Sequence, residues 1–110
     1  MTMVSFEDWK KFDIRIGEIL TAVRVPDTDK LLQLTVNVGE ESPRQIISGI
    51  AAYAEPETLV GKKFPFIVNL EPRVIRGLES QGMILAVSSP EGDFSFLEPT
   101  ADIGAGSIIK

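Results

Sequence analysis

The chain has 110 residues, of which 44% are hydrophobic and 25% charged, and its formal net charge is −5. This length fits one domain with a single β-barrel core and is too short for an enzyme built of two lobes. The acidic balance argues against indiscriminate binding to a polyanion.

Cysteine and histidine are both absent. Without them the chain has no disulfide framework, no thiolate nucleophile, no soft metal ligands and none of the usual general bases. We therefore expect no enzymatic activity, no cofactor and no functional metal. The lack of disulfides favours the cytoplasm, and no apolar run is long enough to span a bilayer.

The chain begins with a predicted short helix and a long strand. Ser5, followed by two acidic residues, indicates a helix start, and we expect the helix to reach about Phe12. In the strand that follows, apolar residues alternate up to Ile16 and resume in the opposite phase at Ile19. A slip of one residue at Gly17 is typical of a β-bulge, which lets a long strand serve both halves of a barrel.

Two paired strands and a short helix come next. Residues 32–38 alternate apolar and polar side chains as a half-buried antiparallel strand does, and residues 44–50 follow after a hairpin-like turn. Pro56 suits the first position of a helix and Gly61 suits the position after its end, so we expect a short helix between them.

The second half of the chain completes a barrel. Residues 62–69 form a predicted strand with an edge or a bulge at Pro65, because proline cannot donate to a ladder. After a loop, residues 83–87 are expected to be a buried strand, and the tail adds a turn at 90–93 and a strand at 94–97. This order predicts an all-β, five-stranded Greek-key barrel of the oligonucleotide-binding (OB) type with a C-terminal extension.

The segment 61–83 is net basic, with four bases and two acids, whereas the rest of the chain is net acidic. Arg73 and Arg76 lie in its Pro-containing loop, and arginine suits phosphate oxygens and also stacks on bases. A solvated loop with ion pairs to Glu71 or Glu79 explains the same pattern. Aromatic side chains are too few in the barrel region to support a generic stacking platform for single strands.

Several segments together resemble one family closely. It is the tRNA-binding domain found at the C-terminus of many methionyl-tRNA synthetases, in the cytokine precursor associated with eukaryotic synthetase complexes, and as free-standing dimeric proteins. The matching residues are 12–19, 26–31, 38–39, 43–50 and 69–83, in order and at matching spacing. The resemblance implies tRNA as a partner, a homodimer and a methionyl-tRNA synthetase assisted in trans, and the lack of a long apolar run predicts no role at a membrane.

The resemblance also implies which residues face tRNA. The matching positions are Lys30, Arg44, Ser48, Asn69, Arg73, Arg76, Ser80 and Met83. The basic residues would neutralise phosphates, and the hydroxyl and amide groups would hydrogen-bond the RNA backbone or bases. Asn69 and Ser80 would equally well fasten the loop to the sheet. Met83 is a residue type found more often in a core than at a contact.

Glu71 is a departure from the family pattern, which often has lysine there, and an anion in this loop should weaken binding. With ~4 phosphate contacts per protomer, log affinity should fall by about 3–4 per decade of salt. Arg73 replaces another frequent lysine, and Val25 stands where histidine commonly precedes the Pro-Asp pair.

We expect one domain over residues 1–110, with the leading helix and barrel at about 1–88 and the extension at about 89–110. The free-standing length resembles the dimeric type, in which this extension forms much of the subunit contact. A second branch of the family resembles dimeric secretion-related chaperones that bind polypeptides. The acidic balance and Glu71 favour that branch, whereas the intact arginine pattern favours tRNA binding.

Overall fold

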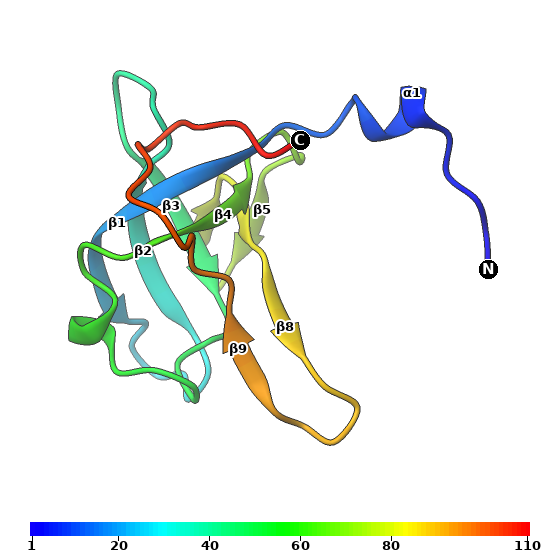
Figure 1. Cartoon of the computed structure of the whole chain (residues 1–110). Coiled ribbons are helices and arrows are strands. Elements are labelled where there is room, and N and C mark those ends of the chain that lie inside the picture. The colour runs from blue at the N-terminus through cyan, green and yellow to red at the C-terminus, as the bar shows by residue number, and fades with distance from the viewer.

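The computed structural model describes residues 1–110, whose strands form a small antiparallel barrel (Figure 1). Its five-stranded sheet has the order β3-β2-β1-β4-β7. The bounds are β1 Ile14–Arg24, β2 Leu32–Asn37, β3 Arg44–Ser48, β4 Lys63–Ile67 and β7 Met83–Ile84. The barrel nearly closes where Gln81 lies along the free edge of β3 and donates its N–H to the Gln45 carbonyl at 2.8 Å. The predicted OB-type barrel is confirmed.

Strand β2 supplies the centre of the core because all its apolar side chains point inward. Leu32, Leu34 and Val36 are fully buried, and so is Val38 just after the strand. They belong to a cluster of 13 buried residues that also contains Phe66 of β4. The alternation of period two therefore predicted the inward face correctly, and β2 pairs with β3 as expected.

Gly17 of β1 is a packing residue. The predicted bulge at this position is misplaced, because pairing with β4 runs without a break through Gly17 and the irregularity lies between Ile19 and Thr21. A Cβ on Gly17 would lie 2.7 Å from both Phe66 Cδ1 and Val36 Cγ1. The apolar residues change phase in the sequence because the first half of β1 is buried on both faces, with Ile16 on one face and Ile19 on the other.

Both predicted short helices are present. In α1, Phe6–Trp9, the Ser5 hydroxyl accepts a hydrogen bond from the Asp8 N–H at 3.1 Å, although the helix ends before the expected Phe12. The second, η1 at Pro56–Thr58, is a single 3₁₀ turn with proline at its start.

The expected buried strand at 83–87 is wrong in its second half. Ile84 is its only buried member, and β8, Ala86–Ser88, is exposed on both faces and pairs with β9, Phe94–Phe96. The β8–β9 hairpin projects from the barrel (Figure 1), so β8 meets solvent, while Phe94 and Phe96 of β9 are half-buried and pack against the core. The β4–β7 ladder is two residue pairs long, and just beyond it the Leu85 N–H donates to the Pro65 carbonyl at 3.0 Å. Pro65 also pairs with Ile16 of β1, so it lies inside the sheet at the end of the β7 ladder rather than on an open edge.

The C-terminal extension, residues 89–110, returns along the outer edge of β1. The Ile16 N–H donates to the Ser107 carbonyl at 2.8 Å, and the Gly106 N–H donates to the Ile16 carbonyl at 2.7 Å. Two ion pairs attach the extension to the start of β4 and the residue before it, Lys63–Asp102 at 3.3 Å and Lys62–Glu98 at 3.4 Å.

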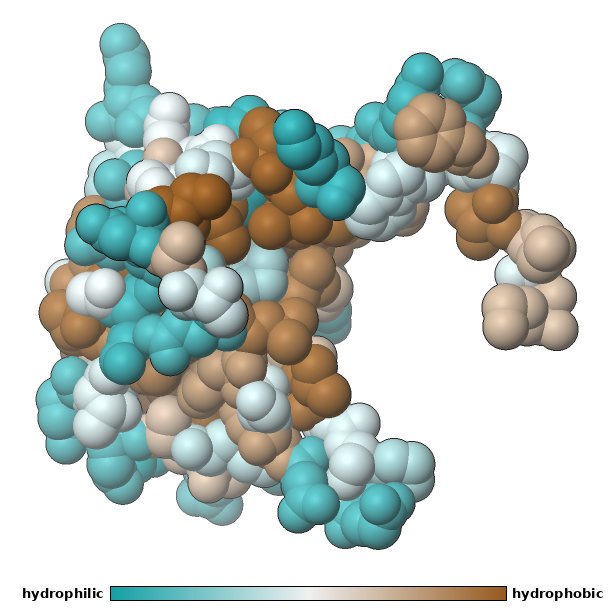
Figure 2. Space-filling model, viewed as in Figure 1, coloured by the Kyte–Doolittle hydropathy of each residue, from teal (hydrophilic) through white to brown (hydrophobic).

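The N-terminal arm, residues 1–12, leaves the barrel and includes α1 (Figure 1). None of the α1 residues is buried, and Phe6 is 69% exposed. Figure 2 shows hydrophobic residues exposed along the arm. No helix in the structure has the length and apolar character needed to cross a membrane.

Candidate nucleic-acid interface

Two loops meet at one end of the barrel and bring together cations that are far apart in the sequence. Loop 25–31 connects β1 to β2, and the hairpin of β5, Arg73–Ile75, and β6, Leu78–Ser80, connects β4 to β7. Lys30 from the first loop and Arg76 from the hairpin line one open depression of about 340 Å³. In OB barrels the face of the second and third strands, between these two loops, is the usual oligonucleotide site.

Arg76 lies at the tip of the β5–β6 hairpin. Arg76 and Gly77 both have positive φ, 53° and 78°, which is the pattern of the two-residue type I′ turn that suits a twisted hairpin. Glycine tolerates this conformation, but an arginine there costs of order 1 kcal/mol. Arg76 is exposed at this tip and is available to a ligand.

The cations without an ion pair are concentrated at this interface. Seven of the 11 lysines and arginines pair with a carboxylate. The four that do not are Lys30, Arg73, Arg76 and Lys110. The alternative in which Glu71 or Glu79 neutralises the hairpin arginines is therefore wrong, because neither acid forms an ion pair.

The basic character of segment 61–83 does not form one surface patch. Lys62 and Lys63 are neutralised by Glu98 and Asp102 of the C-terminal extension. The two loops also carry acids without ion pairs, Asp27 and Asp29 in the same depression as Lys30, and Glu71 beside Arg73. The interface thus has three free cations among nearby anions, and its attraction for phosphate is local and sensitive to salt.

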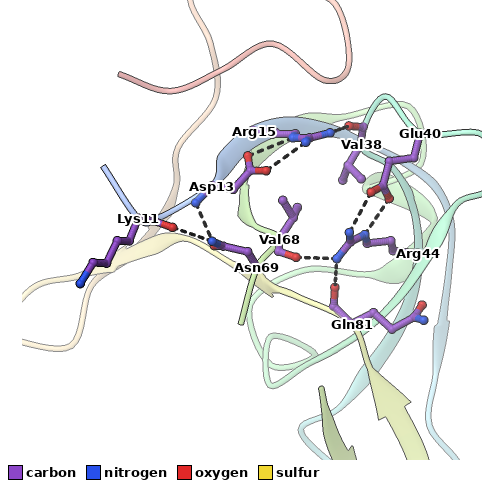
Figure 3. Close-up of polar contacts among 9 residues, drawn as sticks. All are labelled: Lys11, Asp13, Arg15, Val38, Glu40, Arg44, Val68, Asn69 and Gln81. Carbon is purple, nitrogen blue, oxygen red and sulfur yellow. Dashed lines mark hydrogen bonds and ion pairs between the residues drawn. The ribbon is translucent and has the colours of Figure 1, made fainter. Parts of the chain in front are cut away.

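Arg44 is occupied within the protein (Figure 3). Its Nε and Nη2 donate to the two carboxylate oxygens of Glu40 at 2.7 and 2.8 Å, and its Nη1 donates to the carbonyls of Val68 and Gln81. The hydrogen bond to Glu40 raises the pKa of Arg44, and the same bond lowers the pKa of Glu40. The side chain therefore joins β3 to the end of β4 and to the hairpin, and it is not free to bind phosphate as Lys30 is.

Asn69 and Ser80 fasten segments to the sheet. The Asn69 amide accepts from the Asp13 N–H at 2.8 Å and donates to the Lys11 carbonyl at 2.6 Å, which holds the base of the arm (Figure 3). The buried Ser80 hydroxyl accepts from the Ile47 N–H at 3.0 Å and donates to the Gly82 carbonyl at 3.1 Å. Both side chains form their hydrogen bonds within the protein. Their geometry is therefore that of residues that fasten a loop to the sheet.

Ser48 and Met83 also lie on strands beside the hairpin. Ser48 ends β3, is half-buried, and its hydroxyl makes no hydrogen bond within the protein. Met83 is 46% exposed and lines a small notch with Arg73 and Ile47. Its position is thus on the surface rather than in the core, where it can contact a ligand.

Gln81 has a role that residue types alone did not reveal. Its side-chain carbonyl accepts from the Gln45 N–H at 3.0 Å, and the Gln45 amide donates to the Glu79 carbonyl at 2.9 Å. These bonds fix the hairpin to β3 as an added strand. The only sequence signal was the place of Gln81 beside Ser80 in the motif.

Comparison with known proteins identifies the family of this chain. The family described as "Putative tRNA binding domain" matches residues 14–108. The methionine–tRNA ligase of Porphyromonas gingivalis is 46% identical over 107 residues, which are 97% of this chain and 16% of that protein. The chain thus spans about a sixth of the length of the curated relatives it matches.

Two crystal structures share the whole fold. A MetRS-related protein from Pyrococcus horikoshii superposes with a TM-score of 0.93 and 33% identity, covering 100% of both chains. The chaperone CsaA from Bacillus anthracis superposes with a TM-score of 0.87 and 28% identity, covering 99% of this chain and 100% of that one.

Proposed function

Because the chain belongs to the tRNA-binding domain family, we propose that it acts as a non-catalytic module that reads tRNA structure with little dependence on sequence. The observation that carries the proposal is the placement of the free cations. Lys30, Arg73 and Arg76 form no ion pairs; Lys30 and Arg76 line one depression, and Arg73 lies on the same β5–β6 hairpin as Arg76, beside the strands that OB barrels commonly use for oligonucleotides.

The proposed contacts are mainly to phosphate. Lys30, Arg73 and Arg76 supply the charge, Ser48 and Met83 border the contact, and Arg44, Asn69 and Ser80 hold the loops in place. Three phosphate contacts per protomer predict that log affinity falls by about 2–3 per decade of salt. This is shallower than the slope expected when Arg44 is counted as a contact.

A salt titration of tRNA binding tests the proposal. Replacing Arg73 and Arg76 by glutamine should reduce both the affinity and the steepness of the salt dependence. The matched control replaces Lys10 and Lys11 by glutamine, which changes the net charge equally on the N-terminal arm. Equal losses in the two variants would remove the hairpin from the mechanism and leave only non-specific attraction.

We also propose that the module is a homodimer that works in the cytoplasm and delivers tRNA to a methionyl-tRNA synthetase. The dimer is supported by an apolar hollow of about 590 Å³ between the C-terminal extension and the barrel, lined by Ile16, Pro65, Ile103 and Ile108 among others. Replacing Ile103 and Ile108 by aspartate should give a monomer by light scattering. The control, Val74→Asp on the exposed hairpin, should remain dimeric.

Polypeptide binding is the second candidate function. It is favoured by the exposed apolar arm and by the likeness to the chaperone CsaA at 28% identity. Suppressed aggregation of a chemically denatured test protein, together with no tRNA binding at low salt, would reverse the order of the two proposals.

A further inference from the structure

Four aromatic rings form a continuous ladder from the barrel to the surface. Phe64 of β4 stacks on Phe96 at a centroid distance of 4.7 Å, and Phe96 meets Phe94 edge to face at 4.9 Å. Phe94 then stacks on Tyr53, with centroids 4.1 Å apart and planes 5° apart. Because Phe64 is buried in the core, the ladder fixes the orientation of the outermost ring.

Tyr53 is the open end of this ladder. Phe94 covers one face of its ring, yet the residue is 52% exposed. Its hydroxyl forms no hydrogen bond within the protein, as is common for a half-exposed tyrosine. A flat, rigid and half-exposed aromatic surface therefore faces solvent with an unused polar group at its edge.

The position of Tyr53 connects it to the phosphate-binding loops. Tyr53 lies in loop 49–55, and the Ala51 N–H in this loop donates to the Lys30 carbonyl at 3.0 Å. Lys30 in turn shares its depression with Arg76. Figure 1 shows loop 25–31 and loop 49–55 at the same end of the barrel, near the start of β9.

We infer that Tyr53 is a stacking site for one unpaired nucleobase of the bound RNA, next to the phosphate contacts of Lys30 and Arg76. This inference rests on the proposed function and adds a subsite to it. A base on the outer face would extend the ladder by one ring. Stacking on a fixed ring is tolerant of sequence, because every base has a π-face.

An anchor for the β8–β9 hairpin needs only the inner face of the ring. Any bulky apolar side chain at position 53 could pack against Phe94 in this way. An aromatic ring with a face open to solvent is not needed for anchoring. The two roles therefore differ in how they rank substitutions at position 53. Stacking requires an aromatic ring, whereas anchoring requires only apolar volume.

The first test measures tRNA affinity for Tyr53→Phe and Tyr53→Leu. Leucine keeps apolar contact with Phe94 but removes the stacking surface, so affinity should fall about tenfold with an unchanged salt slope. Phenylalanine should stay within about twofold of wild type, since only the hydroxyl is lost. Equal affinity of the leucine variant and wild type overturns the inference.

The second test is spectroscopic. The chain has one tyrosine and one tryptophan, so in a Trp9→Phe background the tyrosine emission reports on Tyr53 alone. Saturating tRNA should quench this emission, and it should not do so in the Arg73→Gln/Arg76→Gln variant at the same concentration. Binding without quenching rejects the stacking site and leaves the tRNA function standing, whereas absence of any binding rejects both.

Discussion

The β5–β6 hairpin and the C-terminal extension are both added to the barrel, yet they treat basic residues in opposite ways. The extension neutralises cations of the barrel, since Lys62 and Lys63 form ion pairs with its Glu98 and Asp102. The hairpin is attached by a serine hydroxyl, a glutamine amide and one clamped arginine, and its own arginines stay free. The chemistry of attachment, rather than the number of charges, decides which cations remain for a ligand.

The largest expected effect breaks the hairpin clamp. Arg44→Ala leaves the Glu40 carboxylate and the Val68 and Gln81 carbonyls without their donor, and should lower the free energy of unfolding by about 2 kcal/mol. Lys62→Ala, which removes an exposed ion pair of the extension, should cost about 0.5 kcal/mol or less. Denaturant unfolding measures both. Equal losses would mean that the two attachments have the same strength.

Ser80→Ala removes the buried hydroxyl that joins the hairpin to β3. The Ile47 N–H then lacks an acceptor, and the free energy of unfolding should fall by about 1–2 kcal/mol. Hydrogen exchange at the Ile47 amide should also become faster, which locates the loss. Ser95→Ala is the control, because that exposed hydroxyl bonds only to the adjacent residue. Unchanged exchange at Ile47 would contradict the assigned role.

Glu71→Gln should make the β5–β6 hairpin more attractive to phosphate, because it removes an anion beside Arg73. We expect tRNA affinity to rise about threefold at low salt and the gain to vanish at high salt, where the charge is screened. Glu91→Gln changes the net charge equally in the β8–β9 turn and serves as the control. A similar gain in both variants would show that net charge, and not the hairpin, limits binding.

The smallest expected effect concerns pH. The pKa of Glu40 is lower in the folded protein than its ordinary 4.5 because of the hydrogen bond from Arg44. Its contribution is therefore fully present above that value and is lost as pH falls through the folded pKa. The stability difference between wild type and Glu40→Gln should be largest above pH 4.5 and should shrink as the pH falls below that value. A constant difference would show that the pair does not stabilise the fold.

The strands with one buried face were predictable from sequence. In β2, for example, apolar residues alternate with polar ones because one face of the strand packs on the core and the other does not. The alternation failed in β1, where the returning extension buries the second face, and in β8, where the hairpin leaves the barrel. In both cases the outcome depended on a segment far away in sequence. No local pattern around Gly17 or Val87 contains that information.

The site was predictable only as a set of residue types. Arg73 and Arg76 belonged to a recognisable motif, but their freedom from ion pairs depended on where Glu71 and Glu79 point. Arg44 has the same side chain and is clamped, because the β2–β3 connection places the Glu40 carboxylate 2.7 Å from its Nε. Tertiary structure decides which carboxylate each cation pairs with, and amino-acid composition does not contain that information.

The bonds between Ile16 and residues 106–107 also bear on how the chain folds. They join β1 to a segment about 90 residues later in the chain, and closing so long a loop is slow because chain entropy opposes it. The barrel core does not need this contact, since its cluster reaches from Ile19 to Ile84. The extension should therefore dock after the barrel has formed. The apolar hollow between the extension and the barrel would then be the last part of the surface to form.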